Sequence, residues 1–411
     1  MRLPVIGNIS TKDGATNKNA RLTNMLAEQK KNGTTLATVR PGLNTLATGS
    51  GAGNSLVCFG GELVNIYGDT VYSSQTYSIE ESMTDLGTLG GTTSVAYDVS
   101  ADGEIVVGYA YNGSGQQRAF RWTSAGGMVD LGTLGGASST ARGVSSDGTT
   151  IVGQSAPTAF RWTSGGGMVD LGTLGGAYSE AIKASSDGGI IVGWAWNALS
   201  KYRAFRWTSD GGMVDLGTLG GAESQATYIT PDGIKIIGKS KAANEEYHLF
   251  LWTSGGGMSD LGSLGIDIDP QCMSDDGGVI VGSYTNESAN PVAFIWTESG
   301  GVQDMGLGDG SVASGVSPNG GVVVGSYYNT SLGQYRGFIW TPSEGATYLG
   351  TLGGNSSFAH RIATNDHKII VGRSNNGANT HAFLYEDDHE ETTSTAIGTV
   401  TDNFFDFALI P

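Results

Sequence analysis

Asp85-Leu-Gly-Thr-Leu-Gly-Gly91 begins a segment that the chain repeats, and this repeat decides the fold. The segment continues through Val99-Ser-Ala-Asp-Gly103, Ile105-Val-Val-Gly108 and Arg118-Ala-Phe-Arg-Trp-Thr123 before the Asp-Leu-Gly box returns at Asp130. Seven copies follow one another with a period of about 44 residues, which is typical of a repeat architecture. Each copy has an aromatic residue near its end: Trp122, Trp162, Trp207, Trp252, Trp296, Trp340 and Tyr385.

Each copy contains four segments that we expect to be strands. In the first copy these are residues 94–100, 104–110, 117–123 and 128–134. Asp102-Gly103 has the chemistry of a tight hairpin, because glycine readily adopts the positive φ that such turns need. The second segment is nearly all apolar, as in a strand covered on both faces. Phe120 and Trp122 of the third segment share one face, since side chains alternate along a strand.

Four strands per copy predict an all-β protein with the β-propeller fold, in which four-stranded blades form a ring. A β-solenoid is the alternative, but its coils are shorter and do not need three hairpins each. Strand-like segments in 49–84 and 392–411 are expected to close the ring. The ring has seven blades if the termini complete the last copy and eight if they build a further blade, and the sequence leaves both open.

We therefore divide the chain into two parts. Residues 1–48 form an extended basic N-terminal segment, and residues 49–411 form the propeller, with the repeats at about 85–391. The 67 glycines without a Gly-X-Y period exclude collagen, and the 8 Trp, 16 Tyr and 12 Phe suffice for a large core. Cys58 and Cys272 cannot form a disulfide framework. We expect neither a signal peptide nor a membrane span, since no apolar stretch is long enough.

Charge is distributed unevenly along the chain. Residues 1–50 hold seven Lys and Arg against two acidic residues, so the net charge of −17 leaves −22 for the remainder. Affinity for nucleic acid comes largely from Lys and Arg, so a body this acidic repels phosphate groups. Sequence-specific DNA binding is therefore not expected.

The copies resemble the HAF repeat, which is named for His-Ala-Phe. His381-Ala-Phe383 reproduces the name, and Arg118, Thr158 and Arg203 take the place of the histidine in other copies, together with the Asp-Leu-Gly-Thr-Leu-Gly-Gly box. The resemblance covers about residues 85–385. It implies a fold and says little about activity.

A second resemblance concerns the N-terminal segment. The run Asn19-Ala-Arg-Leu-Thr-Asn-Met-Leu-Ala-Glu28, followed by Leu36-Ala-Thr-Val-Arg-Pro-Gly-Leu43, resembles the start of the tail hub or nozzle proteins of short-tailed bacteriophages, the packaged-DNA stabilization proteins. Leu26 stands where an aromatic residue is frequent in that family. The resemblance implies a homo-oligomer, a hexameric ring in the tail of the virion, made in the host cytoplasm and attached to the adaptor at the head-tail connector and to other tail proteins.

In such a ring the packaged DNA passes through without specific binding, which the acidic body of this chain would favour. The ring would extend the DNA channel and help to retain and release the genome. The basic N-terminal segment would dock on an acidic neighbour. The residues we single out for this docking are Arg21, Asn24, Met25, Arg40 and Pro41.

No catalytic constellation is visible, and we expect no enzyme, no cofactor and no metal centre. His248 and His381 occupy repeat positions that hold Arg, Thr or Val in other copies, which indicates a structural role. The recurring Ser-x-Asp-Gly is interpreted as a hairpin turn, because the aromatic residue of a sialidase Asp-box is missing after it. Asp267 with Asp269, or Asp275 with Asp276, would suit calcium by their carboxylates, but neither pair completes a ligand set in the sequence.

One group of residues goes beyond a structural role. The segment after the Val-Val-Gly strand is aromatic in several copies, and exposed aromatic rings stack on sugars or anchor partner proteins. Packing of blade against blade is the alternative explanation. A host-receptor or glycan-binding propeller with no channel role is therefore the second functional hypothesis, with a host surface glycan as its ligand. The residues are Tyr109, Tyr111, Trp194, Trp196, Tyr202, Tyr284, Tyr327, Tyr328 and Tyr335.

Overall fold

All regular elements in the described part of the chain are strands. The computed structural model describes residues 25–29, 35–39, 55–59, 62–67, 70–75, 82–363, 369–386 and 395–399. The chain divides into two compact units, residues 1–80 with 389–411 and residues 81–388. Among the described residues no helix is long and apolar enough to span a membrane.

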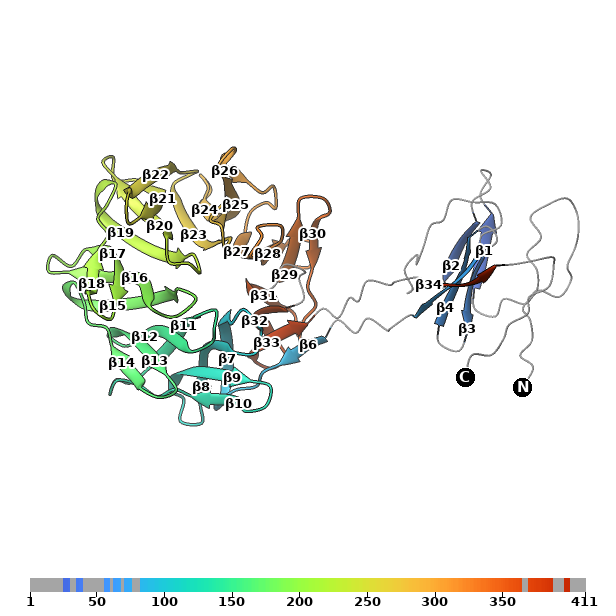
Figure 1. The fold of residues 1–411 in the computed structure, drawn as a ribbon, viewed down its shortest axis with the longest axis horizontal. Coiled ribbons are helices and arrows are strands. Elements are labelled where there is room, and N and C mark those ends of the chain that lie inside the picture. Colours follow the sequence, from blue (N-terminus) through green and yellow to red (C-terminus); the bar gives the residue numbers. More distant parts are fainter. Residues whose placement is uncertain are drawn as a thin grey trace, which may run out of the picture. The chain divides into compact units, whose positions relative to one another are not determined.

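The unit 81–388 is a ring of seven four-stranded antiparallel sheets, the blades (Figure 1). Blade 1 consists of β7 (Gly90–Val99), β8 (Val106–Asn112), β9 (Gln117–Thr123) and β10 (Gly127–Asp130), each paired with the next. Blades 2 to 6 repeat this order: β11 (Ser139–Val144), β12 (Thr150–Ser155), β13 (Thr158–Thr163), β14 (Gly167–Asp170); β15 (Gly175–Ala184), β16 (Ile190–Asn197), β17 (Tyr202–Thr208), β18 (Gly212–Asp215); β19 (Gly220–Ile229), β20 (Lys235–Ala242), β21 (Tyr247–Thr253), β22 (Gly257–Gly262); β23 (Asp267–Met273), β24 (Val279–Thr285), β25 (Pro291–Thr297), β26 (Gly301–Asp304); β27 (Val312–Val316), β28 (Val323–Asn329), β29 (Gln334–Thr341), β30 (Gly345–Tyr348).

Blade 7 closes the ring, because it takes its fourth strand from the segment that precedes blade 1 in the sequence. It contains β31 (Ser357–Ile362), β32 (Ile369–Asn375) and β33 (Thr380–Glu386), and its fourth strand is β6 (Ser82–Asp85). The predicted all-β propeller is confirmed, with seven blades rather than eight.

The expected role of the C-terminal segment in closure needs correction. The strand in 392–411, β34 (Thr395–Thr399), pairs with β5 (Thr70–Gln75) in a sheet with β3 (Ser55–Phe59) and β4 (Glu62–Tyr67). The three strands of the last copy leave one open edge, and β6 alone occupies it. The propeller unit is therefore shorter than the expected 49–411. In the other unit, β1 (Met25–Gln29) also pairs with β2 (Thr35–Val39).

The repeated phenylalanine of the third strand and a repeated glycine of the second strand form the core of each blade. In blade 1, Phe120 is fully buried and is paired with Gly108 across β8 and β9. A Cβ atom on Gly108 would lie 1.9 Å from the carbonyl oxygen of Val95, because β7 has a bulge between Ala96 and Asp98. Only glycine fits at this position. The buried phenylalanines of the seven blades are Phe120, Phe160, Phe205, Phe250, Phe294, Phe338 and Phe383.

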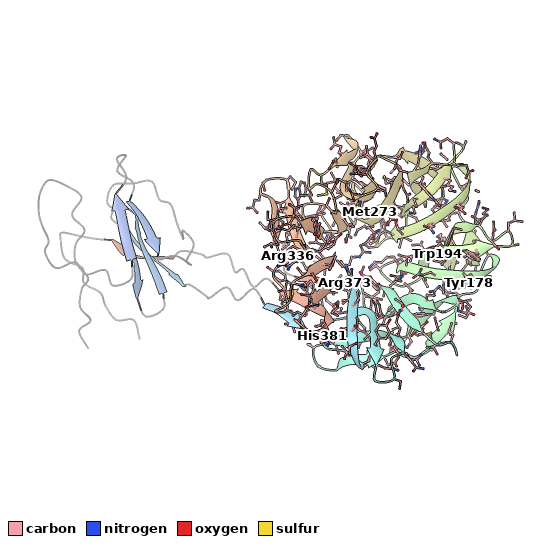
Figure 2. The ribbon with its side chains drawn as sticks, turned by 180° about the vertical axis from the view of Figure 1, so that it is seen from behind. Tyr178, Trp194, Met273, Arg336, Arg373 and His381 are labelled. Carbon is pink, nitrogen blue, oxygen red and sulfur yellow. The ribbon has the colours of Figure 1, made fainter. Side chains whose placement is uncertain are left out.

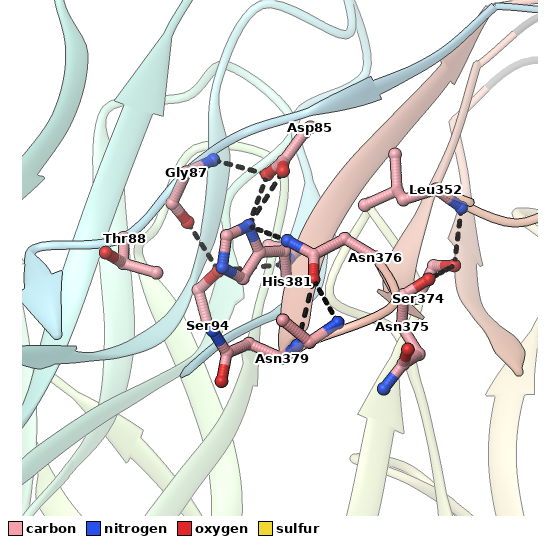
Figure 3. A network of polar contacts seen from close by, with 12 residues as sticks. Asp85, Gly87, Thr88, Ser94, Leu352, Ser374, Asn375, Asn376, Asn379 and His381 are labelled. Atoms are coloured by element: carbon pink, nitrogen blue, oxygen red, sulfur yellow. Dashed lines mark hydrogen bonds and ion pairs between the residues drawn. The ribbon is translucent and has the colours of Figure 1, made fainter. Parts of the chain in front are cut away.

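At six of the seven junctions a repeated serine joins a blade to the one before it. At the closing junction the Ser94 hydroxyl accepts the Ala382 N–H at 2.8 Å and donates to the carbonyl of Gly87 (Figure 3). Both ends of the repeat array are thus connected by the same contact that connects internal blades. Five further serines accept the equivalent N–H: Ser139, Ser179, Ser224, Ser311 and Ser357.

The position before Ala-Phe joins the third strand to the outer strand. His381 Nδ1 lies 2.7 Å from the Asp85 carboxylate (Figure 3). In blade 4, His248 Nδ1 lies 2.9 Å from the Asp260 carboxylate. Arg203 makes the equivalent ion pair in blade 3, at 2.9 Å from Asp215. The two histidines therefore lie in structural contacts within a blade.

The Ser-x-Asp-Gly segments are turns between first and second strands, as the sequence indicated. Ser100 donates its hydroxyl to Asp102, and the Glu104 N–H also donates to this carboxylate, at 3.0 Å. Gly103 has a φ of 78°, which residues other than glycine rarely adopt. Hydrogen bonds of the same kind lower the pKa of Asp187, where the largest contribution is the Gly189 N–H.

Candidate functional site

The aromatic residues that the sequence singled out lie where the second strand of a blade ends and the third begins. Equivalent ends of the blades lie on the same face of a propeller. The structure separates these residues into groups with different surroundings, so they do not form one continuous site.

The largest group is in blade 3 and is called the aromatic cluster below; it consists of Tyr178, Trp194, Trp196 and Tyr202. Figure 2 labels Tyr178 and Trp194. The ring centroids of Trp194 and Tyr202 are 5.1 Å apart, and those of Tyr178 and Trp196 are 4.6 Å apart, both edge to face. Tyr178 keeps 43% of its surface exposed. The buried Nε1 of Trp196 has no hydrogen-bond partner among the described residues. The cluster is a rigid, partly exposed aromatic surface.

A charged network in blade 4 continues from Lys201, the neighbour of Tyr202. The carboxylate of Glu223 accepts the Tyr247 hydroxyl at 2.9 Å and lies 3.3 Å from Lys241 and 3.8 Å from Lys201. Burial alone would raise the pKa of Glu223, but the hydrogen bonds from Tyr247 and Lys241 lower it overall. The hydrogen bond to Glu223 raises the pKa of Lys241 in turn. Donors and acceptors for hydroxyl groups therefore lie beside aromatic rings.

Tyr178 and Glu223 were missed in the sequence, although a signal was present. Both occupy the same position of the repeat, directly before the junction serine, where the first two copies have Thr93 and Ser138. A large or charged side chain in place of a small hydroxyl residue marks copies 3 and 4 as different. The comparison of copies at this position would have identified both residues.

The predicted aromatic residues of blade 1 pack near the blade 7 junction. Tyr109 lies 5.9 Å from Tyr97 and 6.1 Å from Tyr111 between ring centroids, and Tyr97 stacks on His360 of blade 7 at 5.6 Å. Burial raises the pKa of Tyr109. Packing between blades, the alternative explanation, therefore describes this group in part.

The remaining predicted residues are in blades 5 and 6. Tyr328 and Tyr335 are in contact at 5.2 Å, and Tyr335 stacks on Phe358 of blade 7 at 5.2 Å. Tyr284 donates to Asp304 at 3.1 Å and Tyr327 stacks on the ring of Tyr348, so both point toward an outer strand. They do not belong to the aromatic cluster.

A buried charged cluster joins the inner strands, and no pattern in the sequence predicts it. Asp98 accepts the Val144 N–H at 2.8 Å and forms ion pairs with Lys183 and Arg361. Only 2% of the Asp98 side chain is exposed. Tyr228 lies beside both cations, and burial raises its pKa well above the usual value. One carboxylate thus connects blades 1, 2, 3 and 7.

The expectations about metals and docking meet different outcomes. Among the described residues no group of three or more His, Cys, Asp or Glu is placed to hold a metal ion. Asp267 and Asp269 both lie 3.4 Å from Lys239, and Asp276 accepts hydrogen bonds within its own turn. Of the predicted docking residues, Met25 is the first residue of β1. The others lie outside the described residues: Arg21, Asn24, Arg40 and Pro41.

Comparisons with known proteins find structural similarity alone. Neither a protein-family model nor a curated protein matches this chain. TolB from Acinetobacter baumannii is similar with a TM-score of 0.43 and 14% identity, over 81% of this chain and 79% of TolB. The Cps50 (Swd1) β-propeller domain from Myceliophteria thermophila is similar with a TM-score of 0.49 and 10% identity, over 74% of this chain and 99% of that domain. The strand pairing described above therefore remains the basis of the fold assignment.

Proposed function

We propose that this chain is a non-enzymatic structural protein of a bacteriophage virion, a tail hub or nozzle subunit. Its ring of subunits would extend the DNA channel and help to retain and release the packaged genome. The observation that carries the proposal is the stretch from Asn19 to Leu43, which resembles the start of such proteins. The two halves of this stretch contain the paired strands β1 and β2, in the unit that is separate from the propeller.

The charge of the chain supports the same function. A conduit for DNA should not retain it by binding, and a body with a net charge of −22 outside residues 1–50 repels phosphates. The basic N-terminal segment has the opposite charge and suits an acidic neighbour in the tail.

Quantitative mass spectrometry of purified particles from the source tests this proposal. The copy number of the chain is compared with those of the portal and major capsid proteins in the same particles. A copy number half that of the portal is expected for a hexamer below a dodecameric portal. If the chain is missing from particles that contain portal and tail proteins, the tail-hub proposal is wrong.

The aromatic cluster favours a second candidate, a propeller that binds a host receptor or surface glycan. Rings at the cluster offer flat apolar surfaces, and Lys201 and Glu223 beside them offer hydrogen bonds to hydroxyl groups. These are the two features that sugar binding requires.

A glycan array with the full chain tests the second candidate. We expect Trp194→Ala and Trp196→Ala to abolish binding that the unchanged chain shows. Tyr328→Ala is the matched control, because Tyr328 is an exposed aromatic residue of another blade. Equal losses in all three variants would contradict a site at the aromatic cluster.

A further inference from the structure

Arg373 is an arginine without a carboxylate partner near the middle of the ring (Figure 2). It lies on β32, opposite Phe358 on β31, and its guanidinium carbon is 4.3 Å from the centroid of the Phe358 ring. Its buried Nε–H has no hydrogen-bond acceptor among the described residues. The side chain is partly exposed. The stacking contact thus holds a guanidinium whose donors are not used by the protein.

The cations on the first strands of blades 2, 3 and 7 are neutralised. Arg142 lies 2.6 Å from Glu180, and Asp98 serves both Lys183 and Arg361. Within the described residues, no carboxylate lies within ion-pair distance of Arg373. The local balance of charge near Arg373 is therefore positive in a protein that is otherwise strongly acidic.

The groups that face Arg373 from the neighbouring strands add no negative charge. His360 lies on β31, and the positive charge of Arg373 adds to burial in lowering its pKa. Its Nδ1 lies 2.6 Å from the carbonyl oxygen of Ala96. A carbonyl only accepts hydrogen bonds, so Nδ1 carries the proton. Burial lowers the pKa of His360 to about 4, which keeps the ring neutral. Burial raises the pKa of Tyr109 in blade 1, although the positive charge of Arg373 acts in the opposite direction. The Tyr109 side chain therefore keeps its hydroxyl proton and adds no negative charge.

We infer that the guanidinium of Arg373, held against the Phe358 ring, is a binding site for a small oxyanion group. A planar guanidinium held by an aromatic ring is suited to a carboxylate or phosphate, which accept its paired N–H donors. The group is carried by a free small molecule or by an acidic sugar of a glycan. This inference does not rest on the proposed tail function or on the aromatic cluster, which lies in another blade.

Titration of the full chain with three probes tests the site: sodium glucuronate, inorganic phosphate and uncharged glucose. The readouts are isothermal titration calorimetry and the NMR signal of the Arg373 Nε–H. We expect an anion to bind and shift this signal, and glucose to do neither. A glucuronate-containing oligosaccharide that binds more tightly than both free anions identifies a glycan as the source, and preference for phosphate identifies a free phosphorylated ligand.

Arg373→Gln is expected to weaken anion binding by at least about tenfold, as the loss of a charge-assisted hydrogen bond implies. Arg336→Gln is the matched control, because Arg336 lies on the neighbouring blade and already donates to backbone carbonyls. Its affinity should stay within about twofold of the unchanged chain. If neither anion binds or shifts the Arg373 signal in the unchanged chain, the inference is overturned, whatever the variants do. Equal anion affinity in Arg373→Gln and the unchanged chain overturns it as well.

Discussion

Replacing Gly153 by alanine should destabilise the propeller, and the structure gives the size of the effect. The new Cβ atom would lie 2.0 Å from the carbonyl oxygen of Thr140, where real Cβ contacts are essentially never shorter than 3.0 Å. It would also lie 3.0 Å from the ring of Phe160. Strand β12 must therefore move away from β11, which has its bulge at this point. Overpacking costs about 1–3 kcal/mol and a lost ladder hydrogen bond about 1 kcal/mol more.

We expect a loss of about 3 kcal/mol, which lowers the melting temperature by about 6 °C in a domain of this size. Gly165→Ala in the same blade is the control, because its Cβ meets nothing within 4 Å and its φ is not positive. That variant should be neutral or more stable by up to about 1 kcal/mol, since alanine restricts the unfolded chain. Differential scanning calorimetry of both variants measures the difference. Equal melting temperatures would show that the bulge does not require glycine.

Three further changes test other parts of the ring. Ser94→Ala and Ser179→Ala should each cost about 1–3 kcal/mol in urea unfolding, because each leaves a buried backbone N–H without an acceptor, and unequal costs would show that the closing junction differs from an internal one. Asp98→Ala should cost about 3–5 kcal/mol because it leaves two buried cations, whereas Asp215→Ala at the exposed pair should cost less than about 1 kcal/mol. The folded pKa of His360, about 4, lies below the unfolded value of 6.5, so its contribution is complete above pH 6.5 and is lost as the pH falls toward 4. Between pH 7 and pH 5 the free energy of unfolding of the unchanged chain should therefore fall by roughly 2 kcal/mol more than that of His360→Gln. An equal fall in both proteins would contradict this assignment.

The repeat period and the strand pattern predict most of the propeller, and local hydrogen bonds account for what they miss. The fourth segment of the first copy was expected to extend over 128–134, but β10 ends at Asp130. The Asp130 carboxylate accepts the Gly132 N–H at 2.8 Å, and Gly132 has a φ of 80°. This turn ends the strand although apolar residues follow it. The number of blades depends on the strand with which β6 pairs, and no local sequence pattern specifies that strand.

The candidate sites were predictable only where one copy carries the residues. Trp194, Trp196 and Tyr202 are close in sequence and lie on paired strands, so their contact follows from the hairpin. Asp98 and Lys183 are two blades apart and meet because of the ring geometry and the bulge of each inner strand. Pairing between distant copies of this kind needs the three-dimensional structure.

The closure by β6 has a consequence for how such chains change over evolutionary time. Ser82 and Glu386, where the ring begins and ends, are cross-strand partners. The strands that precede and follow the ring in the sequence, β5 and β34, pair with each other. For the sheet that contains β5 and β34, the whole ring takes the place of a hairpin loop. A gene for this protein can therefore gain, lose or exchange its ring as a cassette, or change the number of copies within it, while the flanking strands keep their partners.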